Sequence, residues 1–231
     1  MIKLSWAVPA LILALAAGAS AADPQSQKYP PLDQYMMPHA AEMSLARSAA
    51  PESITSHATV KVLGSSGYTV AVNGDNGFTC MVMRGWAAPT YTPAQLRGIV
   101  YDAKVRAPIC FDPIASRTVM PYYELRSQLG LQGQSPDQIA KGVQSAYDTG
   151  RLPKREAVSF AYMWSAEQYL GPGAGHWHPH LMIFAPYYDN AKLGGNAFGG
   201  PLPGLSDDAG TPFAVVVVPL DHELFIKMSQ R

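Results

Sequence analysis

Alternating apolar and polar positions predict strands in the first third of the chain. Residues 58–63 and 68–72 alternate on either side of a Gly-Ser-Ser-Gly turn, and a third run follows at 78–84. Asn73-Gly74 and Asn76-Gly77 precede the third run, and Asn and Gly adopt the positive φ angles of tight hairpins at little cost. The pattern therefore predicts a three-stranded antiparallel meander.

A helical period replaces this alternation in the middle of the chain. One helix is expected over residues 121–129, where apolar residues recur every three or four positions. A second is expected from Pro136 onward. Ser135 and Gln138 have the spacing of a capping box, in which each side chain binds a backbone N–H at the helix start. A short helix is expected earlier, at 40–49.

The last third of the chain returns to strand patterns. Strands are expected at 158–164, 180–186 and 213–220, and the last two are apolar on both faces, as in central strands covered on each side. Residues 187–212 between them are rich in Gly and Pro; loops of this length are lids, binding loops or disordered segments. The fold class predicted is α+β, a single domain over 39–231 with an antiparallel or mixed sheet of about six strands and packed helices.

The N-terminus has the three parts of a secretory signal peptide. Lys3 supplies the positive charge, residues 6–17 are largely apolar, and Ala19-Ser20-Ala21 gives the small-residue cleavage pattern. A transmembrane anchor needs about 20 apolar residues, and this run is shorter. We therefore expect residues 1–21 to be removed and 22–38 to form a Pro-rich extended segment. The mature protein is expected to be periplasmic or secreted, with no membrane span.

The charge balance of the mature chain excludes several partner classes. Without Lys3 it carries 16 basic and 17 acidic side chains. No basic stripe is available for phosphate backbones, so nucleic acid is not expected as a partner. No polybasic helix indicates membrane-surface binding either. About 210 residues suffice for one domain that buries about 70% of its unfolded surface.

Cys80 and Cys110 are the two cysteines. An even count in an exported protein favours a disulfide, which would contribute about 3 kcal/mol by restricting the unfolded chain. The alternative is a cysteine nucleophile or a metal thiolate, which an oxidising compartment disfavours.

Three histidines recur at alternate positions directly before a predicted strand. His176, His178 and His180 should point the same way along an extended chain, about 7 Å apart. Two imidazoles at that spacing can converge on one Zn²⁺ or Cu²⁺ ion. The same histidines would alternatively hydrogen-bond to loop backbone and hold the preceding glycine-rich segment in place. Metal-free acid–base chemistry is a third interpretation.

Further metal ligands would have to come from elsewhere in the chain. His222 and His39 are the candidates. Methionines directly precede His39, and because thioether sulfur is a copper ligand, the metal could be copper as well as zinc. Glu167 and Glu223 are candidate bases for a metal-bound water. No hydrolase nucleophile elbow, phosphate-binding loop or zinc-protease motif is present in the sequence.

Two segments resemble a family of exported bacterial proteins with no assigned activity. They are Ala-Pro-Glu-Ser-Ile at 50–54 and His-Leu-Met-Ile-Phe-Ala-Pro at 180–186. The resemblance spans much of the mature chain and implies bacterial export and a single domain. It carries over no cofactor and no catalytic residue.

Three functions are compatible with these patterns. The first is a metal-dependent periplasmic enzyme, such as a hydrolase, that uses the histidine row as ligands. The second is a non-catalytic module that binds a small molecule or a cell-wall fragment under its glycine-rich loop. The third is a metal carrier or stress-protective protein. In each case the site is expected where residues 176–180 meet the 187–212 loop.

Overall fold

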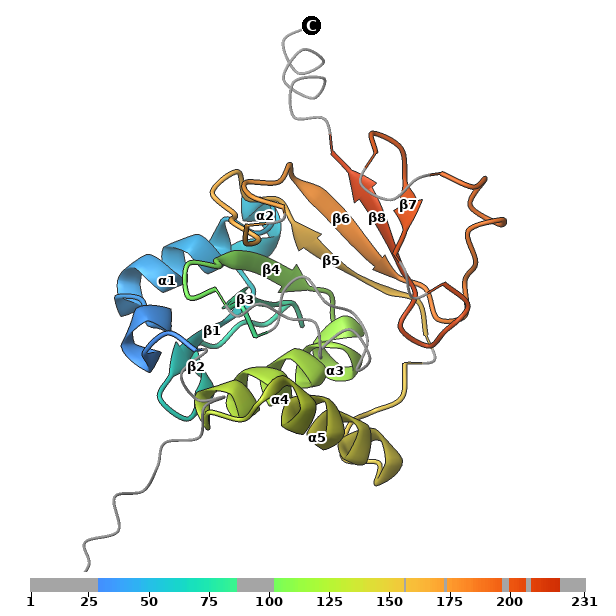
Figure 1. Cartoon of the computed structure of the whole chain (residues 1–231). Helices are drawn as coiled ribbons and strands as arrows, with labels where there is room; N and C mark the ends of the chain where they lie inside the picture. Colours follow the sequence, from blue (N-terminus) through green and yellow to red (C-terminus); the bar gives the residue numbers. More distant parts are fainter. Residues whose placement is uncertain are drawn as a thin grey trace, which may run out of the picture.

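A mixed eight-stranded sheet with helices on both faces makes up the protein (Figure 1). The computed structural model describes residues 29–86, 102–155, 157–172, 174–196, 200–206 and 209–220. The strand order is β2-β1-β3-β4-β5-β6-β8-β7. The predicted α+β class is confirmed, with eight strands instead of about six. The strands are β1 (Thr59–Gly64), β2 (Gly67–Val72), β3 (Thr79–Met83), β4 (Ala107–Phe111), β5 (Ser159–Met163), β6 (His180–Phe184), β7 (Gly204–Leu205) and β8 (Val215–Pro219).

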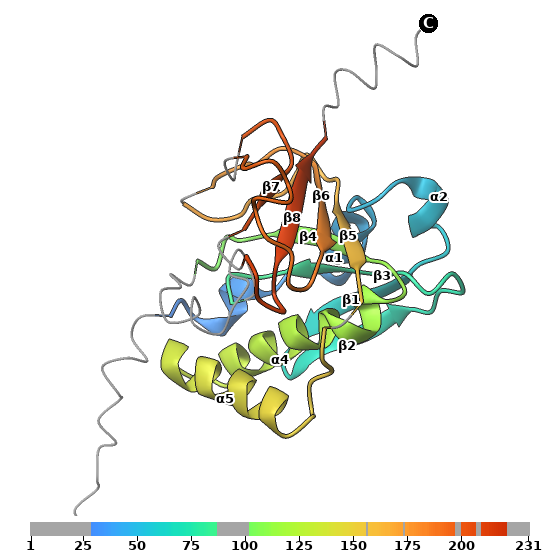
Figure 2. The same cartoon turned by 90° about the vertical axis from the view of Figure 1, so that its right-hand side faces the viewer.

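The helices form two layers around this sheet. Helix α1 packs on one face, whereas α4 and α5 lie on the other (Figure 2). The predicted capping box of α5 is confirmed: Ser135 accepts from the N–H of Gln138, whose side chain binds the N–H of Ser135. The helices are α1 (His39–Arg47), α2 (Glu52–Thr55), α3 (Ala115–Thr118), α4 (Met120–Leu131) and α5 (Pro136–Asp148), preceded by a 3₁₀ turn at Leu32–Tyr35.

The predicted antiparallel meander is wrong at its third strand. Strands β1 and β2 form the expected hairpin, but β3 pairs with β1 in parallel. The Asn-Gly segment crosses the end of β1 so closely that a Cβ on Gly74 would lie 2.2 Å from the Thr59 nitrogen. All five residues of β3 are buried. Strand β3 lies between β1 and β4 and pairs with both. The last strand of a three-stranded meander would have a partner on one side only.

Strand β4 was absent from the sequence prediction, and Pro108 at its second position explains why. Proline cannot donate to a sheet ladder and is normally confined to edges. The adjacent strand β5 pairs with β4 only at Cys110 and Phe111. Pro108 therefore lies where β4 has no neighbour on that side, and the proline is tolerated.

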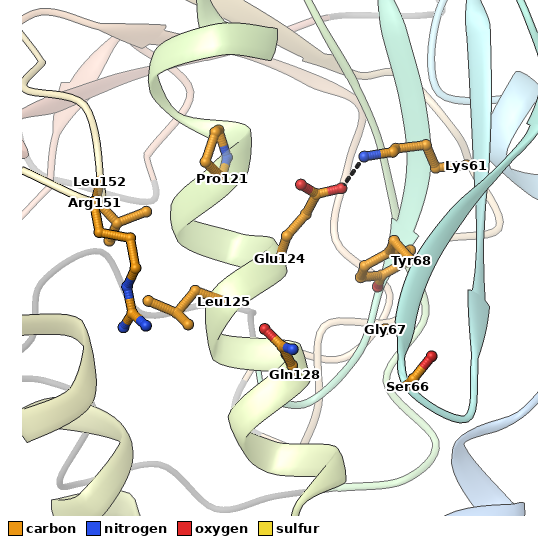
Figure 3. A pocket seen from close by; sticks show the side chains of 10 residues that line it. All are labelled: Lys61, Ser66, Gly67, Tyr68, Pro121, Glu124, Leu125, Gln128, Arg151 and Leu152. Atoms are coloured by element: carbon orange, nitrogen blue, oxygen red, sulfur yellow. Dashed lines mark hydrogen bonds and ion pairs between the residues drawn. The ribbon is translucent and has the colours of Figure 1, made fainter. Parts of the chain in front are cut away.

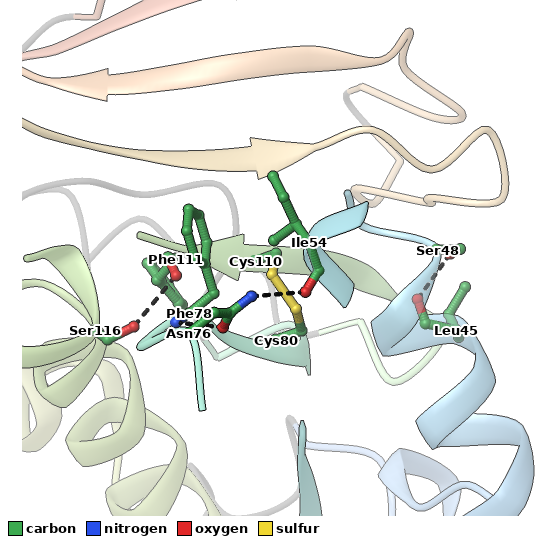
Figure 4. The surroundings of a disulfide bond; sticks show 9 residues. All are labelled: Leu45, Ser48, Ile54, Asn76, Phe78, Cys80, Cys110, Phe111 and Ser116. Carbon is green, nitrogen blue, oxygen red and sulfur yellow. Dashed lines mark hydrogen bonds between the residues drawn. A yellow bond between two sulfur atoms is a disulfide. The ribbon is translucent and has the colours of Figure 1, made fainter. Parts of the chain in front are cut away.

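The expected disulfide is confirmed. Cys80 in β3 and Cys110 in β4 face each other in register and are both fully buried (Figure 4). They belong to the smaller core beneath α1, with apolar side chains such as Ile54 and Phe78 packed against them. Because both sulfurs are bonded to each other, neither cysteine acts as a nucleophile or a metal thiolate in this state.

A buried ion pair fastens α1 to the sheet. Glu42 and Arg84 are 1% and 0% exposed, and Arg84 Nη2 lies 2.8 Å from Glu42 Oε1. The same carboxylate oxygen accepts the backbone N–H of Leu63 at 3.0 Å, and Arg84 Nε donates to the carbonyl of Tyr35 at 2.6 Å. This one pair therefore connects α1, β1, the end of β3 and the 3₁₀ turn.

The predicted N-terminal segments are described only in part. Residues 1–21, expected as the signal peptide, and residues 22–28 lie outside the described residues. In the described remainder of the Pro-rich segment, Tyr35 is buried and stacks on Trp86 with ring centroids 4.0 Å apart. No helix in the described ranges is long and apolar enough to cross a bilayer.

Candidate functional site

The three alternating histidines differ in their surroundings. Strand β6 begins only at His180, which is 1% exposed, whereas His176 and His178 are exposed in the loop before it. Gly175 turns this loop with a φ of +62°. The expectation that all three point one way rests on a regular strand, and residues 176–179 are not part of one.

Gln168 organises the loop that carries the histidines. Its side chain is buried, and its Nε2 donates to the carbonyls of Trp177 and His178, at 2.9 Å each. The backbone carbonyl of Gln168 accepts from Nδ1 of His176 at 3.0 Å, and Nδ1 of His180 donates to the carbonyl of His178 at 3.0 Å. Two of the three histidines thus bind loop backbone, as the structural alternative expects.

The environment of His180 keeps its imidazole neutral. The Trp177 ring lies against the rings of both His178 and His180, with centroids 4.7 Å and 4.6 Å away. Burial lowers the pKa of His180 from 6.5 to about 4. At neutral pH this side chain is therefore an uncharged part of the core.

The depressed pKa of His180 predicts a pH dependence of stability. Between pH 6.5 and about 4 the unfolded chain binds a proton at this residue that the folded chain does not, so stability falls as the pH falls. The slope from this one group approaches about 1.4 kcal/mol per pH unit. Urea unfolding of wild type and His180→Gln at several pH values measures it. The variant should be less stable at neutral pH and should show a shallower slope; equal slopes would contradict the assignment.

The remaining candidate ligands are not gathered around this loop. His39 is exposed at the first residue of α1, which packs on β1, β3 and β4. Glu167 is exposed in a turn, and its N–H donates to Ser165 Oγ. His222 and Glu223 lie outside the described residues. Among the residues that the structure describes, no group of three or more His, Cys, Asp or Glu side chains is placed to hold a metal ion.

The long loop lies on the other side of the sheet from His180. Tyr188 and Leu193 pack against the face formed by Ile183 and Val216. His180 shares the opposite face with every second residue of β6. The junction expected between the histidines and the 187–212 loop is therefore not formed by its described part.

The structure instead presents a cleft over α4 that the sequence did not suggest. Its volume is about 370 Å³, and it lies between α4, the β1–β2 hairpin and the segment after α5 (Figure 3). We call it the α4 cleft. The lining residues are Lys61, Ser66, Gly67, Tyr68, Pro121, Glu124, Leu125, Gln128, Arg151 and Leu152.

Polar and apolar side chains both line the α4 cleft. Lys61 and Glu124 form an ion pair between the hairpin and α4, with side chains 17% and 26% exposed. The Tyr68 hydroxyl donates to the Val82 carbonyl at 2.7 Å, and burial raises the pKa of Tyr68 above its usual range. The Tyr68 side chain is therefore held in one position and uncharged where it lines the cleft. Arg151 and Leu152 approach α4 from the other side (Figure 3).

The chain has no significant match to any protein-family model, curated protein or solved structure. The function is therefore inferred from the chemistry of the described residues.

Proposed function

We propose that this is an exported, non-catalytic binding protein whose small-molecule ligand lies in the α4 cleft. The observation that carries the proposal is the cleft itself. Its volume of about 370 Å³ falls in the range of small-ligand sites, roughly 300–1,000 Å³. A few polar groups around an apolar floor are typical of such sites, because the polar groups orient a ligand whose apolar parts are buried.

The lining suits a cell-wall fragment made of sugar and peptide. The Gln128 amide and the Ser66 hydroxyl match sugar hydroxyls and peptide groups, which both donate and accept. Leu125 offers an apolar surface to a sugar ring, and Arg151 offers a fork to a peptide carboxylate. Glu124 is held in an ion pair with Lys61.

Export is part of the same proposal and has independent support. A fully buried disulfide between neighbouring strands is typical of proteins that fold in an oxidising compartment. The signal-peptide pattern at residues 1–21 supports a periplasmic or secreted location. Cell-wall fragments are available in that compartment.

Calorimetric titration with a soluble disaccharide-peptide from peptidoglycan tests this function. The wild-type protein should bind it, and Arg151→Ala should bind at least about tenfold more weakly, because a charge-assisted hydrogen bond contributes about 1.5–3 kcal/mol. Arg117→Ala, on the exposed surface of α3, is the matched control and should bind like wild type. Equal affinities of the two variants would contradict a ligand in the α4 cleft.

A metal-dependent function is the second candidate, and one observation favours it. Nδ1 of His176 is held by a backbone carbonyl, which leaves Nε2 free, as in metal-bound imidazoles. A Zn²⁺ or Cu²⁺ ion at His176 and His178 would need further ligands, for which His222 is proposed, with Glu223 as base. Metal content of the purified protein, with His176→Ala as comparison, separates this enzyme or metal carrier from the binding module.

A further inference from the structure

Arg155 is a buried cation with open hydrogen-bonding groups. It lies between α5 and β5 and is 4% exposed. Its Nε and Nη2 atoms are buried and meet no hydrogen-bond partner among the described residues. No Asp or Glu of the described residues forms an ion pair with it. A guanidinium that has lost its water without gaining acceptors is costly, because it stays charged at any physiological pH.

The geometry of Arg155 Nε and Nη2 indicates which kind of ligand could accept their hydrogen bonds. Nε and Nη2 lie on one edge of the guanidinium plane, and their N–H bonds point in the same direction. This edge is the fork that binds two oxygens of a carboxylate or phosphate in parallel hydrogen bonds. A single carbonyl oxygen would satisfy only half of it.

The surroundings of Arg155 favour an anion further. Its guanidinium carbon is 4.8 Å from the Tyr122 ring centroid and 4.7 Å from that of Phe213. These rings stabilise the cation but accept none of its edge N–H groups.

Tyr147 lies beside the Arg155 side chain. Its hydroxyl is buried and interacts with Arg155, and its ring meets Phe213 at 5.4 Å. Burial raises the pKa of Tyr147, while the charge of Arg155 and a hydrogen bond with its side chain act in the opposite direction. The hydroxyl therefore stays protonated and able to donate. Arg155 and Phe213 belong to the segments before β5 and β8.

We propose that Arg155, with the Tyr147 hydroxyl, forms a binding site for a small oxyanion that presents two oxygens to the guanidinium edge. The ligand is a free phosphate or the carboxylate of a small organic acid. The site is separate from the α4 cleft, since neither residue lines that cleft. It does not depend on the function proposed above.

Thermal unfolding in sodium acetate and in sodium phosphate, each against sodium chloride at equal ionic strength and pH 7, tests the site. When the anion exceeds its dissociation constant about a hundredfold, the melting temperature should rise by roughly 5–10 °C. A response to acetate indicates a carboxylate ligand, and a response to phosphate alone indicates phosphate. Oxyanions also stabilise proteins by exclusion from the surface, so the decisive quantity is the difference between wild type and variant.

Three variants complete the test. Arg155→Met should lose the anion-specific rise, and Tyr147→Phe should reduce it. Arg117→Met, which removes an exposed guanidinium, should keep all of it. If Arg155→Met does not fold, Arg155→Lys keeps the charge without the fork and should need at least about tenfold more anion. A wild type that responds to neither oxyanion, or a response that survives in Arg155→Met or is unchanged in Arg155→Lys, would overturn the proposal.

Discussion

Replacing Glu42 with glutamine should lower the free energy of unfolding by about 3–5 kcal/mol. Glu42 is the carboxylate that faces the fully buried Arg84, and the substitution leaves that guanidinium without a counter-charge in the core. The same change weakens the bond from the Leu63 N–H to Oε1. Urea denaturation of the mature protein, followed by far-UV circular dichroism, measures the loss.

Two further variants show whether the loss comes from the unpaired cation. Glu42→Leu combined with Arg84→Met removes both charges and should be more stable than Glu42→Gln alone, because no buried charge remains unpaired. Glu52→Gln, at the exposed first turn of α2, should change stability by less than about 1 kcal/mol. A loss below about 1 kcal/mol for Glu42→Gln would show that the pair does not hold α1 to the sheet.

Replacing Cys80 and Cys110 together with alanine should lower the free energy of unfolding by about 3 kcal/mol. The bond joins residues 30 apart in the chain, so breaking it releases conformational entropy in the unfolded state. The two sulfurs are also buried beneath α1, so the alanine pair loses packing as well. Urea unfolding of the double variant beside the oxidised wild type gives the difference.

Thiol titration provides the control for this result. The denatured, unreduced wild-type protein should have no free sulfhydryl, and reduction should release two. Two free thiols before reduction would contradict the pairing. Equal stability of the double variant and wild type would show that the bond forms without stabilising the fold.

Local sequence patterns were sufficient to predict an element when the interactions that form it lie within one short segment. The capping box at Ser135 and Gln138 fixed the start of α5, because both of its hydrogen bonds lie within four residues. The parallel pairing of β3 with β1 could not be predicted, since turn residues report on local dihedral angles and not on which strand is the partner. Strand β4 was missed because Pro108 is acceptable only given the partial pairing with β5.

The candidate sites were harder to predict because they depend on residues distant in sequence. The α4 cleft joins Lys61, Glu124 and Arg151, none of which lies in a motif. The histidine pattern was visible, but its geometry is set by hydrogen bonds to Gln168, a residue with no distinguishing sequence context. A buried Arg155 cannot be recognised from sequence, where it is one of many basic residues.

Backbone amide shifts from two-dimensional NMR, recorded while the disaccharide-peptide is added to ¹⁵N-labelled wild-type protein, test the central claim most directly. A ligand in the α4 cleft should shift amides of residues 66–68 in the hairpin and 122–128 in α4, in proportion to the bound fraction. Residues 176–180 should remain unchanged. Shifts confined to residues 176–180, or no shifts at millimolar ligand, would contradict the assignment of the α4 cleft as the binding site.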